Sequence, residues 1–217
     1  MPATPVPAVR ALKRGGEVGR GRLEAFSDGV LAILITIMVL DLKVPQDAEP
    51  TALLPVLPVF LSYVLSFVYL AIYWNNHHHM LHATERVTGA ILWANLHLLF
   101  WLSLIPFVTG WMGENHFAAT PTALYGIILL MAAIAYWLLQ RSIIADQGRK
   151  SLLAAAVGRD LKGKLSPLFY AGAVLLAFVD TRLSQALYVL VALMWLVPDR
   201  RIVRALQARR QNDAAGR

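Results

Sequence analysis

Long stretches without charge are the feature that most restricts how this chain can fold. Asp, Glu, Lys and Arg are almost absent from blocks of about 15 to 26 residues. A helix that crosses a bilayer needs about 20 mostly apolar residues, whereas the surface helices of a small soluble domain keep a polar face. We therefore expect an all-α integral membrane protein. The candidate spans are Phe26–Leu40, Thr51–Trp74, Val87–Met112, Phe117–Gln140, Leu165–Val179 and Leu183–Val197.

The positions of the basic residues predict the number of spans and their orientation. Lys and Arg gather in the loops and flanks that stay in the cytoplasm. With six spans, all but two of the 20 Lys and Arg residues lie on one side, and the exceptions are Lys43 and Arg182. Joining the last two spans into one helix would move the basic tail across the membrane. We therefore predict six transmembrane helices in the cell membrane, with both termini cytoplasmic.

The same pattern divides the chain into three parts. Residues 1–21 form a basic arm that is rich in Pro, Gly and Arg, has no apolar signal-peptide core and is expected to be disordered. Residues 22–198 form the six-helix transmembrane domain, and residues 199–217 form a basic cytoplasmic tail. The formal net charge of +7 follows from this topology and from attraction to anionic lipid headgroups. It therefore gives no reason to expect a nucleic-acid partner.

Several function classes lack the residues that they require. The chain has no Cys, which excludes disulfides, thiolate metal sites and Cys nucleophiles. We find no GxSxG, HExxH or phosphate-binding loop, so we expect neither an enzyme nor a cofactor. The carbonyl filter sequence of ordinary potassium channels is also missing.

The first span combines an ionisable residue with an aliphatic stripe. Ile33, Thr36, Ile37 and Leu40 follow the spacing i, i+3, i+4, i+7 and share one helix face, while Asp28 projects to nearly the opposite side. A charged residue within a membrane helix is costly and marks a candidate functional site. In one interpretation the stripe lines a functional surface and Asp28 anchors the helix to its neighbours. In the other, the stripe faces lipid and Asp28 caps the helix.

A histidine cluster ends the second span, with His77, His78 and His79 in a row and His82 beyond them. Histidines can bind metals, but adjacent side chains on a helix point about 100° apart. The sequence also has no Asp or Glu between Trp74 and Thr84. We therefore predict no metal site and expect one histidine to bond to another helix, although the pattern leaves ion binding by His77–His79 open.

Polar residues within the third span predict contacts between helices. Asn95, His97 and Ser103 lie in an apolar run, where each interhelical hydrogen bond contributes roughly 0.6 kcal/mol. Pro106 interrupts the same span, and we expect a kink near Ser103–Pro106.

The motif Arg22-xxx-Phe26-Ser27-Asp28-Gly29 resembles that of the endosomal and lysosomal potassium channel family, transmembrane protein 175, and its bacterial relatives. Trp74-xx-His77, Asn95 and Ser103-Leu-Ile-Pro106-Phe107 resemble further landmarks of the family. The resemblance covers roughly Arg22 to Thr109. Beyond Thr109 the chain matches the family only in its pattern of spans.

The resemblance implies a homotetramer of six-helix subunits, in which the first helix of each subunit lines a central pore for K⁺. Aliphatic rings, rather than backbone carbonyls, form the constriction in this family. By alignment from the motif, the ring positions are Ile33, Ile37 and Leu40, and the family's pore hydroxyl falls on Thr36. Our hypothesis is that Ile33 and Thr36 set selectivity, while Ile37 and Leu40 seal the closed pore. The expected K⁺ selectivity is weak to moderate, and the family's link to proton flux leaves proton permeation open.

The motif residues are expected to hold the pore helix against the second and third helices. The residues of this structural network, with their expected partners, are Arg22, Phe26, Ser27, Asp28, Trp74, His77 and Asn95.

Two other function classes remain as alternatives. A proton-coupled secondary transporter could use Asp28 and His77, although transporters more often show internal repeats and broken helices. A membrane enzyme or metal-handling protein could be built on the histidines, and the lack of nearby carboxylates and of Cys counts against it.

Overall fold

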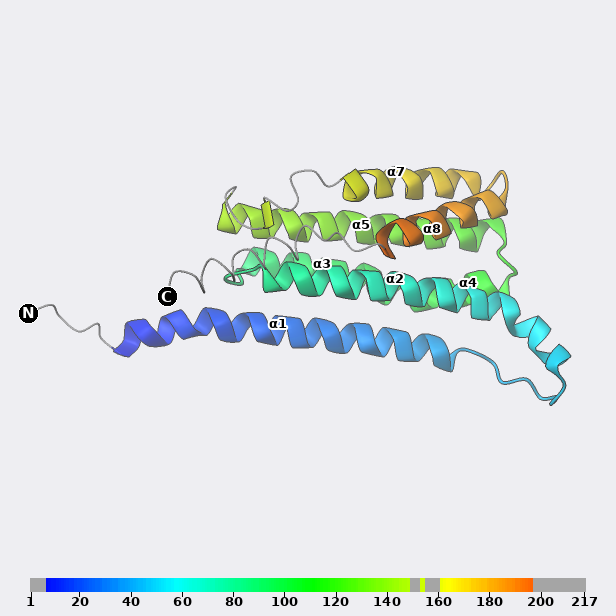
Figure 1. Cartoon of the computed structure of the whole chain (residues 1–217), viewed down its shortest axis with the longest axis horizontal. Helices are drawn as coiled ribbons and strands as arrows, with labels where there is room; N and C mark the ends of the chain where they lie inside the picture. The colour runs from blue at the N-terminus through cyan, green and yellow to red at the C-terminus, as the bar shows by residue number, and fades with distance from the viewer. Residues whose placement is uncertain (1–6, 149–152, 155–160, 197–217) are drawn as a thin grey trace, which may run out of the picture.

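The computed structural model describes residues 7–148, 153–154 and 161–196, and every regular element in these ranges is helical. The helices run roughly along one common direction (Figure 1). α1 lies at one edge and packs on α2, α3 and α4, while α5 packs on α3, α7 and α8. The elements are α1 (Pro7–Leu40), η1 (Pro50–Val56), α2 (Leu57–His82), α3 (Gly89–Ser103), α4 (Ile105–Glu114), α5 (Ala119–Gln147), α7 (Leu161–Leu176) and α8 (Thr181–Leu196).

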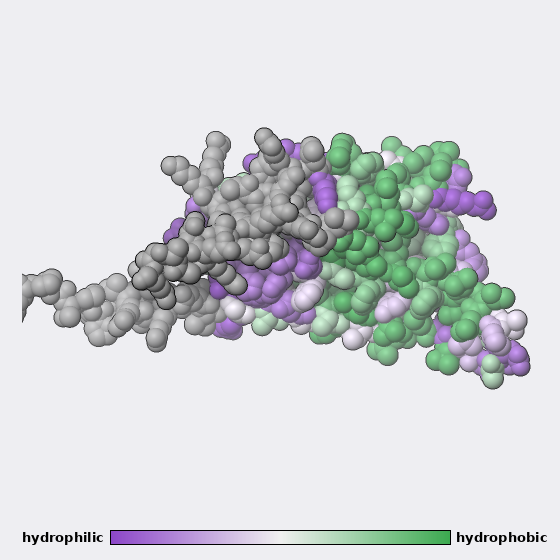
Figure 2. Space-filling model, in the orientation of Figure 1, coloured by the Kyte–Doolittle hydropathy of each residue, from purple (hydrophilic) through white to green (hydrophobic). Residues whose placement is uncertain are grey.

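Four stretches are long and apolar enough to cross a membrane: Gly19–Leu40, Pro50–His82, Gly89–Glu114 and Ala119–Gln147. Hydrophobic residues cover a broad band of the surface in Figure 2, with hydrophilic residues on either side of it. The chain is therefore a multi-pass membrane protein. α7 and α8 have 16 residues each, or about 24 Å of helix, against a hydrocarbon core of about 30 Å. The fifth and sixth crossings stay predictions.

The third predicted span is broken where its proline lies. α3 ends at Ser103, and α4 begins at Ile105 with Pro106 in its first turn. At the junction, the Leu104 N–H donates to the carbonyl of Trp101 at 3.3 Å. Proline has no N–H and its ring clashes with the preceding turn, so the helix restarts at the position where a kink was expected.

The first helix begins at Pro7, well before residue 22, so most of the arm predicted to be disordered has a helical backbone. The basic tail 199–217 lies outside the described residues.

Buried hydroxyls connect the helices behind α1. Tyr69 on α2 donates to the carbonyl of Tyr188 on α8 at 2.6 Å, and the Tyr188 hydroxyl donates to the carbonyl of Thr122 on α5 at 3.0 Å. Ser66 lies 2.6 Å from the hydroxyl of Thr109 and 3.0 Å from that of Tyr125. Since hydrocarbon offers no hydrogen-bond partners, these groups find them inside the protein. They form a bonded scaffold of α2, α4, α5 and α8 against which α1 is placed.

Candidate functional site

α1 has one face fixed to the protein and one face without intramolecular cover. Its buried face packs on the neighbouring helices through Leu23, Ser27, Leu31, Leu34 and Met38. Their spacing of four, four, three and four residues keeps them on one side of the helix. The other side is an apolar surface that the single chain leaves open.

The stripe predicted from the sequence lies on this open side. Ile33 is 57% exposed, Ile37 42% and Leu40 81%, and Thr36 between them is also exposed. The Thr36 hydroxyl donates to the carbonyl of Ile33 at 2.8 Å, so its oxygen lone pairs stay available on the exposed face. Four copies of such a stripe around an axis could present stacked aliphatic rings with one ring of hydroxyl oxygens.

Three network residues meet in a buried chain of hydrogen bonds. His77 Nε2 lies 2.6 Å from Asn95 Oδ1, and Asn95 Nδ2 donates to Ser27 Oγ at 3.0 Å. Ser27 donates in turn to the carbonyl of Leu23 at 2.9 Å. These hydrogen bonds join α2, α3 and α1, and the side chains of His77, Asn95 and Ser27 are almost fully buried. This arrangement fixes the rotation of α1, which in turn fixes the direction of its open stripe.

Asp28 bonds to α2 rather than capping a helix. Trp74 Nε1 donates to Asp28 Oδ1 at 3.0 Å, and Asp28 is half-buried. Because α1 begins at Pro7, Asp28 lies far inside the helix, where a carboxylate cannot cap the terminus. Of the two sequence interpretations of Asp28, the geometry supports the anchor.

Arg22 and Phe26 lie elsewhere. Both are exposed, and Phe26 keeps 54% of its surface. Residues 22, 26, 29 and 33 follow one helix face, so these two side chains continue the stripe of Ile33 rather than the network. In the part of the chain that the structure describes, no hydrogen bond or ion pair joins Arg22 to another residue.

The polar residues of the third span do not all connect helices. Asn95 does, but His97 accepts a hydrogen bond from Trp101 on the same helix at 2.9 Å. Ser103 donates to the carbonyl of Phe100 at 2.7 Å. The expectation of interhelical bonds was therefore wrong for His97 and Ser103, because each found a partner three or four residues away on α3.

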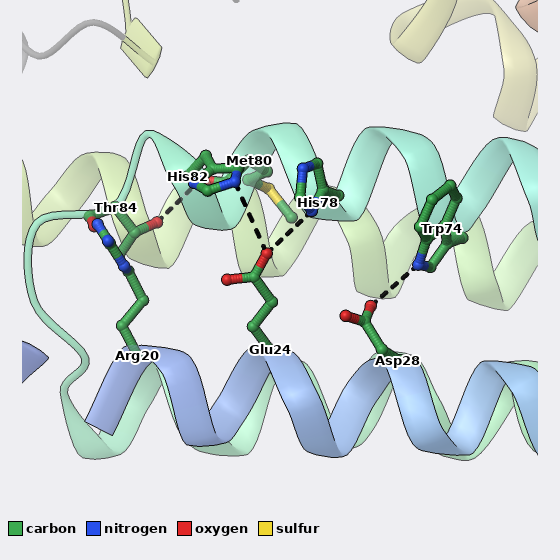
Figure 3. Close-up of polar contacts among 8 residues, drawn as sticks. All are labelled: Arg20, Glu24, Asp28, Trp74, His78, Met80, His82 and Thr84. Carbon is green, nitrogen blue, oxygen red and sulfur yellow. Dashed lines mark hydrogen bonds and ion pairs between the residues drawn. The ribbon is translucent and has the colours of Figure 1, made fainter. Parts of the chain in front are cut away.

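A carboxylate that no sequence pattern had indicated also lies beside the histidines. Glu24 on α1 reaches the histidine cluster, with Oε1 2.9 Å from His78 Nδ1 and 4.0 Å from His82 Nε2 (Figure 3). The spacing of Glu24 and Asp28, four residues apart and hence on one face of α1, was the signal that could have found it. One turn earlier on that face, Arg20 donates to the carbonyl of Thr84 at 3.0 Å.

Two exposed ion pairs tie the loops to the scaffold. Nζ of Lys43, which follows α1, lies 2.8 Å from Oε1 of Glu114 at the end of α4. Nε of Arg86, which follows α2, lies 2.9 Å from Oδ2 of Asp146 on α5. The hydrogen bond to the Glu114 carboxylate, helped by its charge, raises the pKa of Lys43. Asp146 raises the pKa of Arg86 in the same way. Exposed pairs of this kind contribute little to stability.

Comparison with known proteins identifies the family. The sequence profile of the endosomal/lysosomal potassium channel TMEM175 matches residues 22–106. A potassium channel of Chryseobacterium sp. (strain P1-3) is 53% identical over 188 residues, which cover 87% of this chain and 98% of that protein. The chain belongs to the TMEM175 potassium channel family. The resemblance seen in the Phe26-Ser27-Asp28-Gly29 motif is thereby confirmed, and the relatives are channels rather than enzymes.

A further relative and a solved structure can each be aligned with most of the chain. A potassium channel of Streptomyces collinus is 35% identical over 190 residues, 81% of this chain and 90% of that one. The crystal structure of a lysosomal potassium-selective channel TMEM175 homolog from Chamaesiphon minutus superposes with a TM-score of 0.72. The two sequences are 29% identical, and the alignment covers 84% of this chain and 98% of the homolog. The likeness therefore includes α5, α7 and α8 as well as the region of the motif.

Proposed function

We propose that this TMEM175 family member is a K⁺-selective cation channel in which four subunits surround a pore lined by α1. The observation that carries the proposal is the open stripe of α1, whose aliphatic side chains are exposed although the opposite face of the helix is bonded into the subunit. A pore-lining helix needs such a fixed rotation, because every subunit must present the same side chains to the axis.

The stripe suggests how permeation is controlled. A narrow ring of aliphatic side chains excludes water and ions by dewetting, and we assign this seal to Ile37 and Leu40. We assign selectivity to Ile33 and Thr36, since the four Thr36 hydroxyl oxygens could replace part of the hydration shell of K⁺. Proton permeation through the same pore is included in the proposal, and its test is a pH-sensitive dye enclosed in the vesicles.

The remaining features of the proposal concern the surroundings. Six crossings in the cell membrane with both termini cytoplasmic place most Lys and Arg residues beside anionic headgroups. Arg22 and Phe26, which continue the open stripe, would then contact neighbouring subunits or the inner mouth of the pore.

The proposed function is tested by K⁺ flux into liposomes that contain the purified chain, with Na⁺ gradients for comparison. Ile33→Asn is expected to lose the preference for K⁺, because a polar ring admits hydrated Na⁺ as well. Val39→Asn introduces the same group at an exposed position of α1 outside the stripe and should keep the preference. An Ile33→Asn protein with unchanged ion preference, or equal losses in both variants, would contradict a filter on this stripe.

The coupled transporter predicts a different result at Asp28. Asn keeps an oxygen that can accept the hydrogen bond from Trp74 but loses the charge. Asp28→Asn should therefore leave K⁺ flux largely intact in a channel and abolish proton-coupled uptake in a transporter. The bonding of Asp28 to Trp74 and of His77 to Asn95 supports structural roles for both residues and hence the channel.

A further inference from the structure

Three possible metal ligands converge between α1 and α2. Glu24 contributes a carboxylate oxygen from α1, and His78 and His82 contribute ring nitrogens from α2 (Figure 3). The ligand atoms of all three lie within 4.8 Å of one another. They come from segments far apart in the sequence, which is why the sequence offered no carboxylate for the histidines.

Local structure aims these side chains at one point. His78 and His82 are four residues apart on α2 and share one face of the helix, and their ring centroids lie 4.4 Å apart. On α1, Arg20 and Asp28 lie one turn to either side of Glu24, and both are bonded to α2 or the residues that follow it. These bonds hold the two helices in register, so Glu24 is placed opposite the histidines before any ion binds.

The donor set fits a transition metal. Two imidazole nitrogens and one carboxylate oxygen are a common three-ligand set for Zn²⁺, whose fourth tetrahedral position is then taken by water. Ligands about 2.0–2.2 Å from zinc lie roughly 3.4 Å from each other in a tetrahedron. The distances from Glu24 Oε1 to the two nitrogens, 2.9 and 4.0 Å, lie on either side of that value. Small rotations of the side chains would bring both of these distances to the separation expected in a tetrahedral zinc site.

We propose that Glu24, His78 and His82 form a binding site for a divalent transition-metal ion of the zinc class. A hydrogen-bonded ion pair explains His78 but not His82, whose Nε2 points toward the carboxylate from 4.0 Å, beyond hydrogen-bond reach. An ion between the three groups accounts for both histidines. The site is open to solvent, since the side chains are 18%, 35% and 48% exposed for Glu24, His78 and His82.

The environment supports the geometry of the ligands. The ring of His78 is stacked on Trp74, with centroids 6.0 Å apart, and Trp74 is itself bonded to Asp28. Such surrounding contacts orient metal ligands and commonly change affinity by about 10- to 100-fold. A bound ion would cross-link α1 to α2 one turn from the Asp28–Trp74 bond.

The test is calorimetric titration of ZnCl₂ into the purified, untagged full chain in detergent, after removal of metals with EDTA. The variants are Glu24→Gln and His82→Gln, and the matched control is His79→Gln, which removes a histidine of the same helix turn outside the cluster. We expect one Zn²⁺ per chain, an affinity at least about tenfold lower in each ligand variant, and a change under twofold in the control.

A second measurement separates the site from adventitious binding. An ion that joins two helices of the folded protein raises its thermal unfolding temperature. Zn²⁺ should therefore raise this temperature for the original chain and for His79→Gln, but not for Glu24→Gln. If Glu24→Gln does not fold, His82→Gln decides, because His82 is half-exposed. Absence of saturable binding, or equal affinity in all four proteins, would overturn the proposal and leave a Glu24–His78 ion pair. Neither measurement depends on whether the protein conducts K⁺.

Discussion

At the scale of single residues, Thr36 separates two explanations of selectivity. It is the polar member of the open stripe, and its hydroxyl is bonded back to the carbonyl of Ile33. If its oxygen replaces part of the hydration shell of K⁺, Thr36→Ala should lower the K⁺-to-Na⁺ permeability ratio by about tenfold, the effect of roughly 1.4 kcal/mol on a relative barrier. The measurement is the reversal potential under bi-ionic conditions. Thr36→Ser keeps the hydroxyl and serves as the control, and an unchanged ratio in Thr36→Ala would assign selectivity to the aliphatic rings alone.

Asn95 is the residue whose loss should weaken the subunit most directly. It accepts from His77 and donates to Ser27, and all three groups are buried. Asn95→Ala removes the hydrogen-bond partner that His77 and Ser27 share, and an unsatisfied buried polar group costs about 1–3 kcal/mol. We expect a lower melting temperature in size-exclusion thermostability assays. Leu96→Ala, at the next and more exposed position of α3, should change it far less, and similar losses in the two variants would show that the network adds nothing beyond packing.

At the scale of elements, the fastening of α1 is the property on which the site depends. Trp74→Phe keeps an aromatic ring but removes the indole N–H that donates to Asp28. Interhelical hydrogen bonds in membranes contribute about 0.6 kcal/mol on average and up to about 1.7 kcal/mol, so the subunit should fold while α1 becomes looser. A double-mutant cycle with Asp28→Ala, which removes the acceptor, measured by thermal stability, should give a coupling energy in that range. Additive effects of the two changes would mean that the bond does not stabilise the fold.

The sequence predicted elements better than contacts, for physical reasons. Charge-free blocks gave the first four spans, and Pro106 gave the break between α3 and α4, because both signals act within one segment. The stripe from Ile33 to Leu40 followed from helix periodicity. The meeting of Glu24 with His78 depends on how α1 and α2 are placed side by side, which no local pattern records. His97 was expected to bond to another helix, but it accepts a hydrogen bond from Trp101, four residues along the same helix.

At the scale of the whole molecule, the open side of α1 has to meet other copies of the chain if it lines a pore. Leu40, at the end of the helix, is 81% exposed and would stand at one mouth of that pore. The chain has no Cys, so a single introduced thiol can be labelled without background. Modification of Leu40→Cys with a positively charged methanethiosulfonate places four cations around the axis. It should reduce K⁺ flux by about tenfold, equivalent to roughly 1.4 kcal/mol on the permeation barrier.

The control for this prediction is Leu168→Cys on α7, which is exposed but lies at the edge of the subunit opposite α1 (Figure 1). Labelling there should leave flux unchanged if four α1 helices surround the pore. Native mass spectrometry of the same samples should give four times the 24.0 kDa chain. Block at Leu168 rather than Leu40 would place the pore on the other side of the subunit. A dimer with block at Leu40 would keep α1 as the pore helix but require each subunit to contribute a second lining element.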